Sequence, residues 1–397
     1  MANNNVNVPN LRFPEFSGEW VTKSINDLAV VIGGGTPDTT VKSYWDGEIQ
    51  WFTPSEIGKN KYVDSSLRTI TEVGLNNSSA KLLPPNTILL SSRATIGECS
   101  LSLRECATNQ GFQCLVSKKC NVDFLYYLIQ TKKKDLIRKS CGSTFLEISA
   151  NEVRKIQVSV PSDVEQQKIA ELLSLIDERI ATQNKIIDKL KSLIKGLPHK
   201  MAEIGLQKGC WEKVLLSTVL VECKELNSEL YTVHSVSVSE GVINQIEYLG
   251  RSFAAKDTSN YHVARYGDII YTKSPTGDFP YGIVKQSYIE QPVAISPLYG
   301  VYSPTSFETG VYLHYYFMSS VLAKNYLYPL IQKGAKNTIN ISNQRFLENR
   351  IALPLKQTDR HNIARALITI QKKLDIEKCA MDSLTKQRSY LLQQLFI

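Results

Sequence analysis

Small hydroxyl and amide side chains stand beside Lys or Arg at several places in the sequence. This combination suits contact with a polyanion, because it offers hydrogen-bond donors, positive charge and close backbone approach rather than bond-breaking groups. Lys132, Lys133 and Lys134 lie at the end of a predicted helix, and a solvated helix face is the alternative interpretation of that run. The candidate contact residues are Thr36, Ser92, Arg93, Lys132, Lys133, Lys134, Ser143, Thr144, Thr272, Lys273, Ser274, Lys333, Lys336, Asn337 and Thr338.

Motifs for catalysis are missing from the sequence. Gly58-Lys59 is followed by Asn60 and lacks the upstream glycine of a phosphate-binding loop. The run Gly33–Gly35 follows an apolar stretch, but neither G-x-G-x-x-G nor a helix pattern follows it, so a tight turn is expected. The chain has no G-x-S-x-G and no H-E-x-x-H. These residues predict a binding protein and no enzyme.

The cysteines and histidines do not form a metal-binding pattern. The first five of eight cysteines contain no C-x₂₋₄-C pair, and all five histidines follow them in the sequence. Zinc sites usually need closely spaced ligand pairs, so we expect free thiols and no metal.

Composition places the chain among ordinary globular proteins. The hydrophobic fraction is 43% and the charged fraction 21%, which excludes global disorder and collagen-like repeats. Lys and Arg number 46 against 38 Asp and Glu, a net charge of +8 that mildly favours polyanionic partners. No apolar run approaches the roughly 20 residues that a bilayer requires. The first residues resemble no export signal, so a cytoplasmic protein with no membrane contact is expected.

The sequence is duplicated internally. The stretch Ile169–Ile176 recurs at 363–370, a shift of 194 residues, and Ile148-Ser149 recurs as Ile341-Ser342. Further back, Phe124-Leu-Tyr-Tyr127 corresponds to Tyr312-Leu-His-Tyr315, and Trp20 corresponds to Trp211. Matches in the same order indicate two copies of one fold whose loops differ in length.

A long helix is predicted at the end of each copy. Apolar residues recur there in alternating steps of four and three, as in a coiled coil, with polar exceptions at Gln183, Glu377 and Arg388. A narrow apolar stripe needs a partner helix, so we expect the two helices to pair, the alternative being two surface helices packed on their own domains. Gly196 and Pro198 are expected to end or kink the first helix. The expected interface residues are Ile169, Leu173, Ile176, Ile180, Ile187, Leu190, Ile363, Leu367, Ile370, Leu374, Met381 and Leu384.

The predicted fold class is α+β with a pseudo-two-fold internal repeat. Two similar mixed α/β domains alternate with a pair of long antiparallel coiled-coil helices that separate them. The expected boundaries are 1–160 for the first domain, 161–204 for the central helix, 205–353 for the second domain and 354–397 for the C-terminal helix.

The whole chain resembles the specificity subunits of type I restriction–modification systems. The opening stretch 8–20, the turn Gly34-Gly-Thr-Pro37 and the junction Glu165-Gln-Gln-Lys-Ile-Ala170 are similar to segments of that family. The second copy departs from the pattern, because Gln357-Thr-Asp-Arg-His361 replaces the expected Glu-Gln-Gln and no Gly-Thr-Pro turn stands near 221–230.

This resemblance implies a function for each part. Two target-recognition domains each read half of a split sequence in double-stranded DNA, and the helix pair sets the spacer between the halves. The chain is a non-catalytic specificity subunit that binds no cofactor of its own. It docks two methyltransferase (M) subunits, which use S-adenosylmethionine, and restriction (R) subunits, which use ATP and Mg.

Two other functions stay open from the residues. A coiled-coil scaffold whose two heads bind protein partners would show only a mild salt dependence of binding, whereas contacts with phosphate weaken steeply with salt. A nuclease with a degenerate site would cut duplex DNA without partner subunits.

Overall fold

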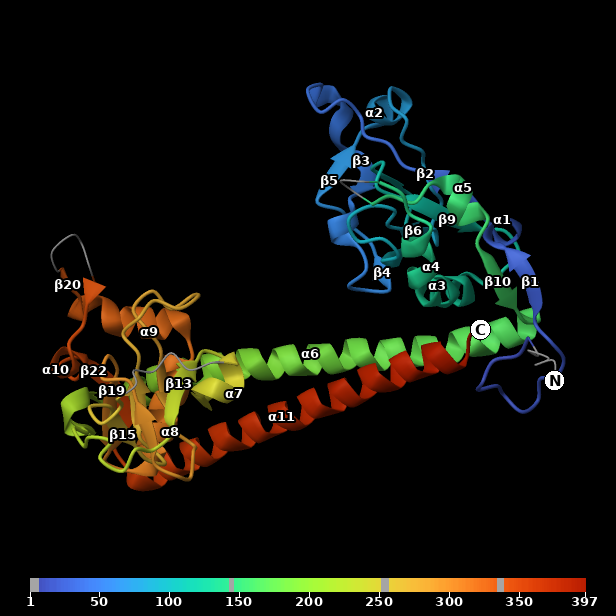
Figure 1. The fold of residues 1–397 in the computed structure, drawn as a ribbon. Helices are drawn as coiled ribbons and strands as arrows, with labels where there is room; N and C mark the ends of the chain where they lie inside the picture. The colour runs from blue at the N-terminus through green and yellow to red at the C-terminus, as the bar shows by residue number, and fades with distance from the viewer. Residues whose placement is uncertain (1–6, 143–145, 251–256, 334–338) are drawn as a thin grey trace. The chain divides into compact units, whose positions relative to one another are not determined.

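The computed structural model describes residues 7–142, 146–250, 257–333 and 339–397. The chain divides into two compact units. Unit 1 comprises residues 1–183 and 380–397, and unit 2 comprises residues 184–379. Each unit therefore contains one globular part and half of each long helix (Figure 1). We call the globular parts head 1, residues 21–160, and head 2, residues 211–354.

Head 1 is built on two sheets. Its strands are β1 (Val21–Ser24), β2 (Ala29–Gly33), β3 (Trp45–Phe52), β4 (Tyr62–Val63), β5 (Arg68–Ile70), β6 (Ile88–Leu90), β7 (Cys99–Ser102), β8 (Cys106–Thr108), β9 (Gln113–Ser117) and β10 (Gln157–Val160). The short helices are α1 (Ile25–Leu28), α2 (Glu72–Asn76), α3 (Val122–Thr131), α4 (Lys133–Arg138) and α5 (Ala150–Arg154). One sheet has the order β2-β9-β6-β7-β4 and the other β5-β3-β8, while β1 pairs with β10.

Head 2 repeats this plan. Its strands are β11 (Trp211–Leu215), β12 (Leu220–Glu222), β13 (Val233–Ser237), β14 (Gly241–Asn244), β15 (His262–Ala264), β16 (Ile269–Tyr271), β17 (Val284–Gln286), β18 (Val293–Ile295), β19 (Gly300–Pro304), β20 (Gln332–Lys333), β21 (Ile339–Asn340) and β22 (Arg350–Pro354). Its helices are α7 (Gln245–Leu249), α8 (Phe307–Phe317), α9 (Ser320–Leu327) and α10 (Asn343–Phe346). The sheets are β12-β19-β16-β17 and β14-β13-β18-β15, while β11 pairs with β22.

The strand orders of the two heads correspond. The order β2-β9-β6-β7 in head 1 matches β12-β19-β16-β17 in head 2, and β5-β3-β8 matches β14-β13-β18. The strand directions agree as well, since β3 pairs parallel with β8 and β13 pairs parallel with β18. Strand β4 in head 1 and strand β15 in head 2 are additions at sheet edges. The fold is α+β with an internal repeat, as the sequence predicts.

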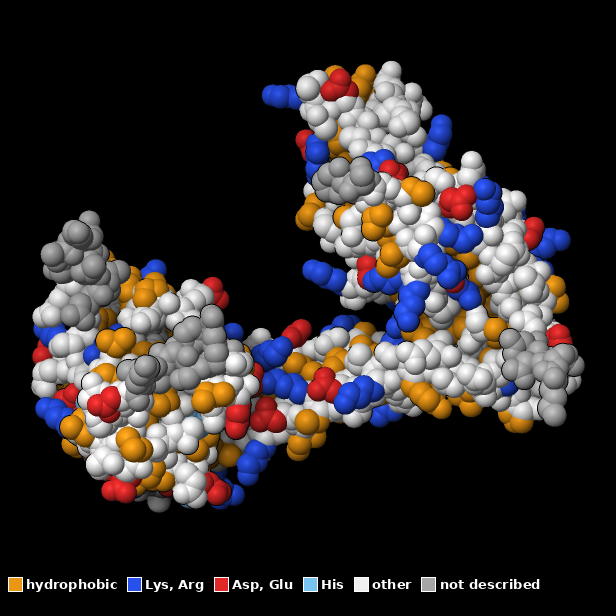
Figure 2. Space-filling view, in the orientation of Figure 1, with side chains coloured by type: hydrophobic (Ala, Val, Ile, Leu, Met, Phe, Trp, Pro, Cys, Tyr) orange, Lys and Arg blue, Asp and Glu red, His pale blue; other side chains and the backbone are white. Residues whose placement is uncertain are grey.

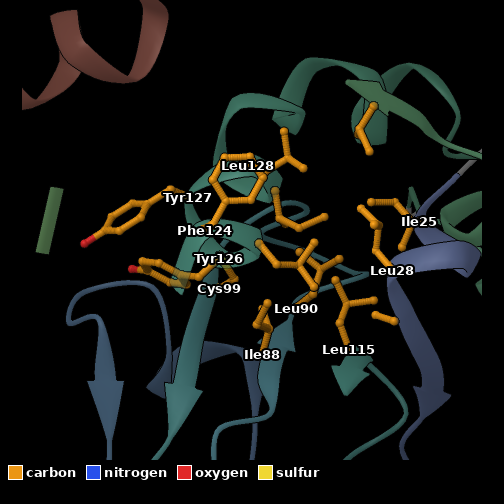
Figure 3. Packing of buried hydrophobic residues seen from close by; sticks show 14 of the residues in the cluster. Ile25, Leu28, Ile88, Leu90, Cys99, Leu115, Phe124, Tyr126, Tyr127 and Leu128 are labelled. Atoms are coloured by element: carbon orange, nitrogen blue, oxygen red, sulfur yellow. The ribbon is translucent and has the colours of Figure 1, made fainter. Parts of the chain in front are cut away.

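The core of head 1 lies between α3 and the larger sheet. Phe124, Tyr127 and Leu128 from α3 are fully buried, as are Leu90 and Leu115 from the sheet. Figure 3 shows these side chains gathered in one cluster, with the hydroxyl of Tyr127 pointing away from it. At about 25 cal/mol per Å² of apolar surface, this burial is the main stabilising contribution to the head.

The helix predicted to end at the Lys132–Lys134 run is followed directly by a second helix. Lys132 ends α3 with φ −92° and ψ 9° and begins α4, so the backbone changes direction at this residue. The Lys132–Lys134 run therefore stands at a junction between helices rather than along one helix face.

Two long helices follow the heads. Helix α6 runs from Asp163 to Gln207, and α11 runs from Gln357 to Gln394. At 1.5 Å per residue these are rods of about 68 and 57 Å. All twelve residues expected at the interface are buried or half-buried. In unit 1, Ile169 and Leu173 share a core cluster with Leu395 and Phe396, so the start of α6 lies beside the end of α11.

Helix α6 does not end at Gly196 or Pro198. Pro198 removes one backbone donor, but its neighbours one turn away, Ile194 and Ala202, are buried at 1% and 7% exposure. The hydroxyl of Tyr312 also donates to the Pro198 carbonyl at 3.5 Å. Tertiary packing within unit 2 therefore outweighs the local preference of proline.

Candidate nucleic-acid interface

The loop after β6 holds the candidate residues Ser92 and Arg93 in head 1. The backbone N–H of Ser92 donates to Gly111, and its carbonyl accepts from Ile148, so the loop is tied to two neighbouring segments. Ser92 is fully buried, and its hydroxyl has no hydrogen-bond partner among the described residues. In this conformation Ser92 supports the loop rather than offering a surface donor.

Arg93 is paired with an acidic residue. Its guanidinium lies 2.9 Å from the carboxylate of Glu147, and the two side chains are 43% and 37% exposed. Lys133 on α4 likewise forms an ion pair with Glu98, at similar exposure. Two of the candidate cations of head 1 thus have a carboxylate partner, which reduces the positive potential that they present.

The ion pair of Glu98 and Lys133 lies at a hollow of ≈ 590 Å³. Ile137 and Leu146 line it and remain 43% and 49% exposed. Apolar side chains of this kind suit the methyl group of thymine, while a carboxylate accepts from the amino group of cytosine. The hollow thus combines exposed apolar side chains with one ion pair.

The three lysines at the α3–α4 junction have different surroundings. The ammonium of Lys132 donates to the backbone oxygen of Ile397 at 2.6 Å, and burial lowers the pKa of Lys132. Lys133 is paired with Glu98, as described above. Lys134 is exposed on α4. Of the three, Lys134 is the most available for a phosphate contact.

The second head carries its candidates in the loop between β16 and β17. Thr272 is buried, and its hydroxyl accepts from the backbone N–H of Ile283 at 3.1 Å. Lys273 is half-buried in a left-handed conformation with φ 62°, and Gly282 opposite it has φ 94°. A Cβ at Gly282 would lie 2.7 Å from the Lys273 backbone nitrogen, so the close approach of the two strands requires glycine. Burial lowers the pKa of Lys273, and nearby Glu222 opposes this shift.

The remaining candidates are only partly visible. Ser274 is exposed. Thr36 is half-buried, and its hydroxyl donates to the amide oxygen of Gln110 at 2.5 Å. Lys333 belongs to β20, but its side chain lies outside the described part of the chain, as do Ser143, Thr144, Lys336, Asn337 and Thr338.

The glycine run at the start of head 1 serves packing. A Cβ on Gly34 would lie 1.9 Å from the Asn109 carbonyl oxygen. The carbonyl of Gly35 accepts from the indole N–H of Trp51 at 2.9 Å, and its N–H donates to Thr108. These contacts place the segment before Thr36 against the β3–β8 sheet. The tight turn expected from the sequence is not found at this run, because Gly33 ends β2 and the chain forms no turn at Gly34 or Gly35.

The junction motif at the start of α6 joins several segments. Arg12 makes two parallel hydrogen bonds of 2.8 Å to Glu165, and this contact raises the pKa of Arg12. The indole of Trp20 donates to the same carboxylate at 3.3 Å. Gln166 accepts from the backbone N–H of Asn121, the N-cap of α3, at 3.0 Å. Adjacent residues of the motif thus bind the N-terminal segment and the main helix of head 1 to α6.

Charge is spread over the surface. Figure 2 shows Lys and Arg side chains scattered across the visible face, with acidic side chains among them. No group of three or more potential metal ligands gathers anywhere in the described ranges. No helix within these ranges is both long and apolar enough to cross a bilayer.

Glu147 and Glu98 were not predicted as site residues. They lie 54 and 35 positions from the cations that they bind, so the local sequence carries no signal for either pair. Only the antiparallel bridge between Arg93 and Glu147, formed on folding, brings the first pair together.

Comparison with known proteins gives consistent matches. Residues 17–192 match the model of the type I restriction modification DNA specificity domain. The MjaIX specificity subunit of Methanocaldococcus jannaschii is 39% identical over 180 residues, which cover 43% of this chain and 42% of that subunit. The EcoR124I/EcoR124II specificity subunit of Escherichia coli is 31% identical over 199 residues, 48% of this chain and 46% of that subunit. Each match thus covers less than half of the relative.

Matches across the whole length are weaker in sequence. The MjaVIII specificity subunit of M. jannaschii is 22% identical and aligns over 97% of this chain and 93% of its own. The type I restriction–modification S subunit from M. genitalium has the same fold, with a TM-score of 0.58 at 16% identity, over 98% of this chain and 99% of that one. Residues 17–192 are thus similar to the type I restriction modification DNA specificity domain, and the whole chain shares the fold of a solved type I S subunit.

Proposed function

We propose that this chain reads a bipartite sequence in double-stranded DNA, one half with each head. The observation that carries the proposal is the corresponding strand order of the two heads, β2-β9-β6-β7 and β12-β19-β16-β17, in a chain whose residues 17–192 match the specificity domain. Two copies of one fold with different loop residues are what two different half-sites require. Arg93 in head 1 and Lys273 in head 2 follow corresponding strands, β6 and β16, and are the first residues to test.

The long helices are proposed to set the spacer between the half-sites. Helix α6 passes without interruption from unit 1 into unit 2, and α11 returns from unit 2 to unit 1. Adding one heptad to each helix would lengthen the rod by about 10.5 Å, which equals roughly three base pairs of duplex. The preferred spacer should then grow by about three base pairs while both half-sites stay the same.

Chemistry is assigned to partner subunits. We propose that the chain performs no catalysis and binds no cofactor. Two M subunits would bring S-adenosylmethionine for methylation, and R subunits would bring ATP- and Mg-dependent activity. Purified chain with Mg²⁺ and duplex DNA should therefore leave the DNA uncut.

The test is selection of bound duplexes from a random library by the full chain, with and without its M subunits. The expected result is one split sequence. A chain with residues 10–160 replaced should no longer select one half of it, and a chain with residues 205–353 replaced should no longer select the other half. The affinity for DNA should fall steeply with salt, by about one power of concentration for each phosphate contacted. Enrichment of no sequence by the chain in complex with M subunits would refute the proposal, and weak salt dependence would favour a protein-binding scaffold.

A further inference from the structure

A chain of polar side chains joins head 1 to both long helices. Lys61, before β4, contacts both Asp123 and Tyr127 on α3. Tyr127 contacts Asp177 on α6, which pairs with Arg388 on α11. We call these five residues the clasp. All five belong to unit 1.

The contacts within the clasp are short and mostly buried. The Lys61 ammonium lies 2.6 Å from the Asp123 carboxylate, and its side chain is 8% exposed. The Tyr127 hydroxyl donates to the Asp177 carboxylate at 2.7 Å. The guanidinium of Arg388 contacts the other oxygen of Asp177 at 2.5 Å, with side-chain exposures of 21% and 15%. The low exposure makes these contacts stronger than a pair on the open surface.

Two further side chains, outside the clasp, accept hydrogen bonds from its cations. Arg388 also donates to the amide oxygen of Gln130 on α3 at 3.0 Å. Lys61 donates to the Ser174 hydroxyl on α6 at 2.7 Å. Lys61 and Arg388 thus each reach both α3 and α6, and Asp177 contacts α3 and α11, so neither long helix can slide without breaking contacts to α3.

The internal repeat has different residues at the corresponding positions in unit 2. The 194-residue shift that relates the two helices carries Asp177 to Gln371, and the reverse shift carries Arg388 to Ile194. Ile194 is buried at 1% exposure, and the side chain of Gln371 donates to Asp375 on its own helix. The ion pair therefore marks one end of a helix pair that otherwise follows the repeat.

An apolar seam alone does not determine register. When apolar residues recur every seven positions, a slip of one heptad again places apolar residues against apolar residues. A buried polar contact removes this degeneracy, because a slipped register leaves a charge buried without its partner, at a high energetic cost. The best-attested use of such contacts is to specify register.

We propose that Asp177 and Arg388 are positioning residues that fix head 1 on the helix pair and thereby sharpen spacer selectivity. The inference rests on the proposed function, because a spacer is measured only if both half-sites are read. The clasp holds the last turns of α11 against α3 and α6. Without the clasp, the end of α11 would be held against α3 by apolar residues such as Leu395 and Phe396 and by the contact of Lys132 with Ile397. Apolar contacts tolerate small shifts, and a shift of about 3.4 Å corresponds to one base pair.

The test compares two matched double variants of the full chain. Asp177→Leu with Arg388→Met removes both charges of the clasp without leaving either unpaired. Gln371→Leu with Ile194→Met introduces the same residues at the repeat-equivalent positions of unit 2. Arg388→Lys keeps the charge beside Asp177, and Tyr127→Phe removes one hydrogen bond while it keeps the ring, so these milder variants remain informative if the first does not fold.

The first measurement is spacer selectivity. Duplexes carry the half-sites selected by the wild-type chain, and the spacer varies by one base pair at a time. We expect the affinity ratio between the best spacer and its neighbours to fall about tenfold in the Asp177→Leu/Arg388→Met variant. A tenfold change corresponds to the free energy of about one or two lost hydrogen bonds. The unit 2 control should keep the wild-type ratio, and the Arg388→Lys variant should keep part of it.

The second measurement needs no DNA. Hydrogen exchange of peptides from 380–394 should become about tenfold faster in the clasp variant and stay unchanged in the control. Faster exchange with an unchanged spacer ratio would overturn the positioning role and leave only a structural one. Unchanged exchange would overturn the clasp itself. If the wild-type chain selected no DNA, the proposed function and the positioning role would fall together, while the exchange data would still decide whether the clasp holds α11.

Discussion

Replacement of Glu165 by alanine is expected to destabilise unit 1 strongly. Glu165 is 1% exposed, and its carboxylate accepts two hydrogen bonds from Arg12 and one from the indole of Trp20. Removal of one partner from a buried ion pair costs about 3–5 kcal/mol, because the remaining charge stays buried without compensation. The Arg12 side chain is 17% exposed and can regain some water, so we expect a loss of about 3 kcal/mol.

Chemical denaturation followed by tryptophan fluorescence measures this loss. Trp20 contacts Glu165 directly, so its emission reports on the affected segment. Hydrogen exchange of peptides from the start of α6 separates the loss in unit 1 from the unfolding of unit 2, since a chain of two units need not unfold in one step. The pair is largely buried, so added salt should change the loss little.

The double variant Arg12→Met with Glu165→Met is the control. Replacement of a buried ion pair by apolar residues of similar volume is often neutral or stabilising, so this chain should lie within about 1 kcal/mol of the wild type. A loss below about 1 kcal/mol for Glu165→Ala would show that the pair contributes like a surface contact. A double variant as unstable as the single one would show that the charge left unpaired on Arg12 is not the cause.

Three further predictions concern single positions. Burial lowers the pKa of Lys285 from 10.5 to about 8, so between these pH values only the unfolded chain holds the proton and the stability of the folded chain rises with pH. The Lys285→Met variant should be more stable than the wild type by up to about 3 kcal/mol at pH 7. This difference, measured by urea titration, should vanish above pH 10.5. A Cβ at Gly205 would lie 2.0 Å from the ring of Trp211, so Gly205→Ala should cost about 1–3 kcal/mol and alter Trp211 emission, whereas a more stable chain would contradict the packing. Glu147→Gln should free Arg93 and strengthen binding to non-specific duplex about tenfold at low salt, and an unchanged salt slope in a filter-binding series would exclude a role for Arg93 in phosphate contact.

The long helices could be predicted because their signal is periodic. Residues such as Leu173, Ile187 and Leu367 recur at coiled-coil spacing, and all three are buried. Periodicity averages over many residues, so the single contrary signal of Pro198 did not change the predicted type of element. It did place the predicted end of the helix too early. The close packing of Gly205 against Trp211 is a tertiary fact with no local pattern.

The candidate site could be predicted only in part. The sequence pointed to Arg93 and Lys133 as cations; Arg93 lies in the loop after β6, and Lys133 is the first residue of α4. Their carboxylate partners depend on which strands and helices meet, and this is fixed only by folding. Electrostatic character is thus less predictable than secondary structure, because it depends on pairs of residues rather than on windows of sequence.

Differences between the two copies carry information that the repeat itself does not. At most equivalent positions of the two long helices an apolar residue faces the seam in both copies, as Leu173 and Leu367 do. Burial alone explains such positions, and either copy would serve. Where one copy has Ile194 and the other Arg388, burial cannot be the reason for the charge, because isoleucine is buried well at the same place. The charge must be explained by what surrounds it in unit 1, namely Asp177 and the polar side of α3. A position where an internal repeat replaces an apolar residue by a paired charge is therefore a place to look for a contact that distinguishes its two halves, and the proposed reading of two different half-sites would need such a distinction.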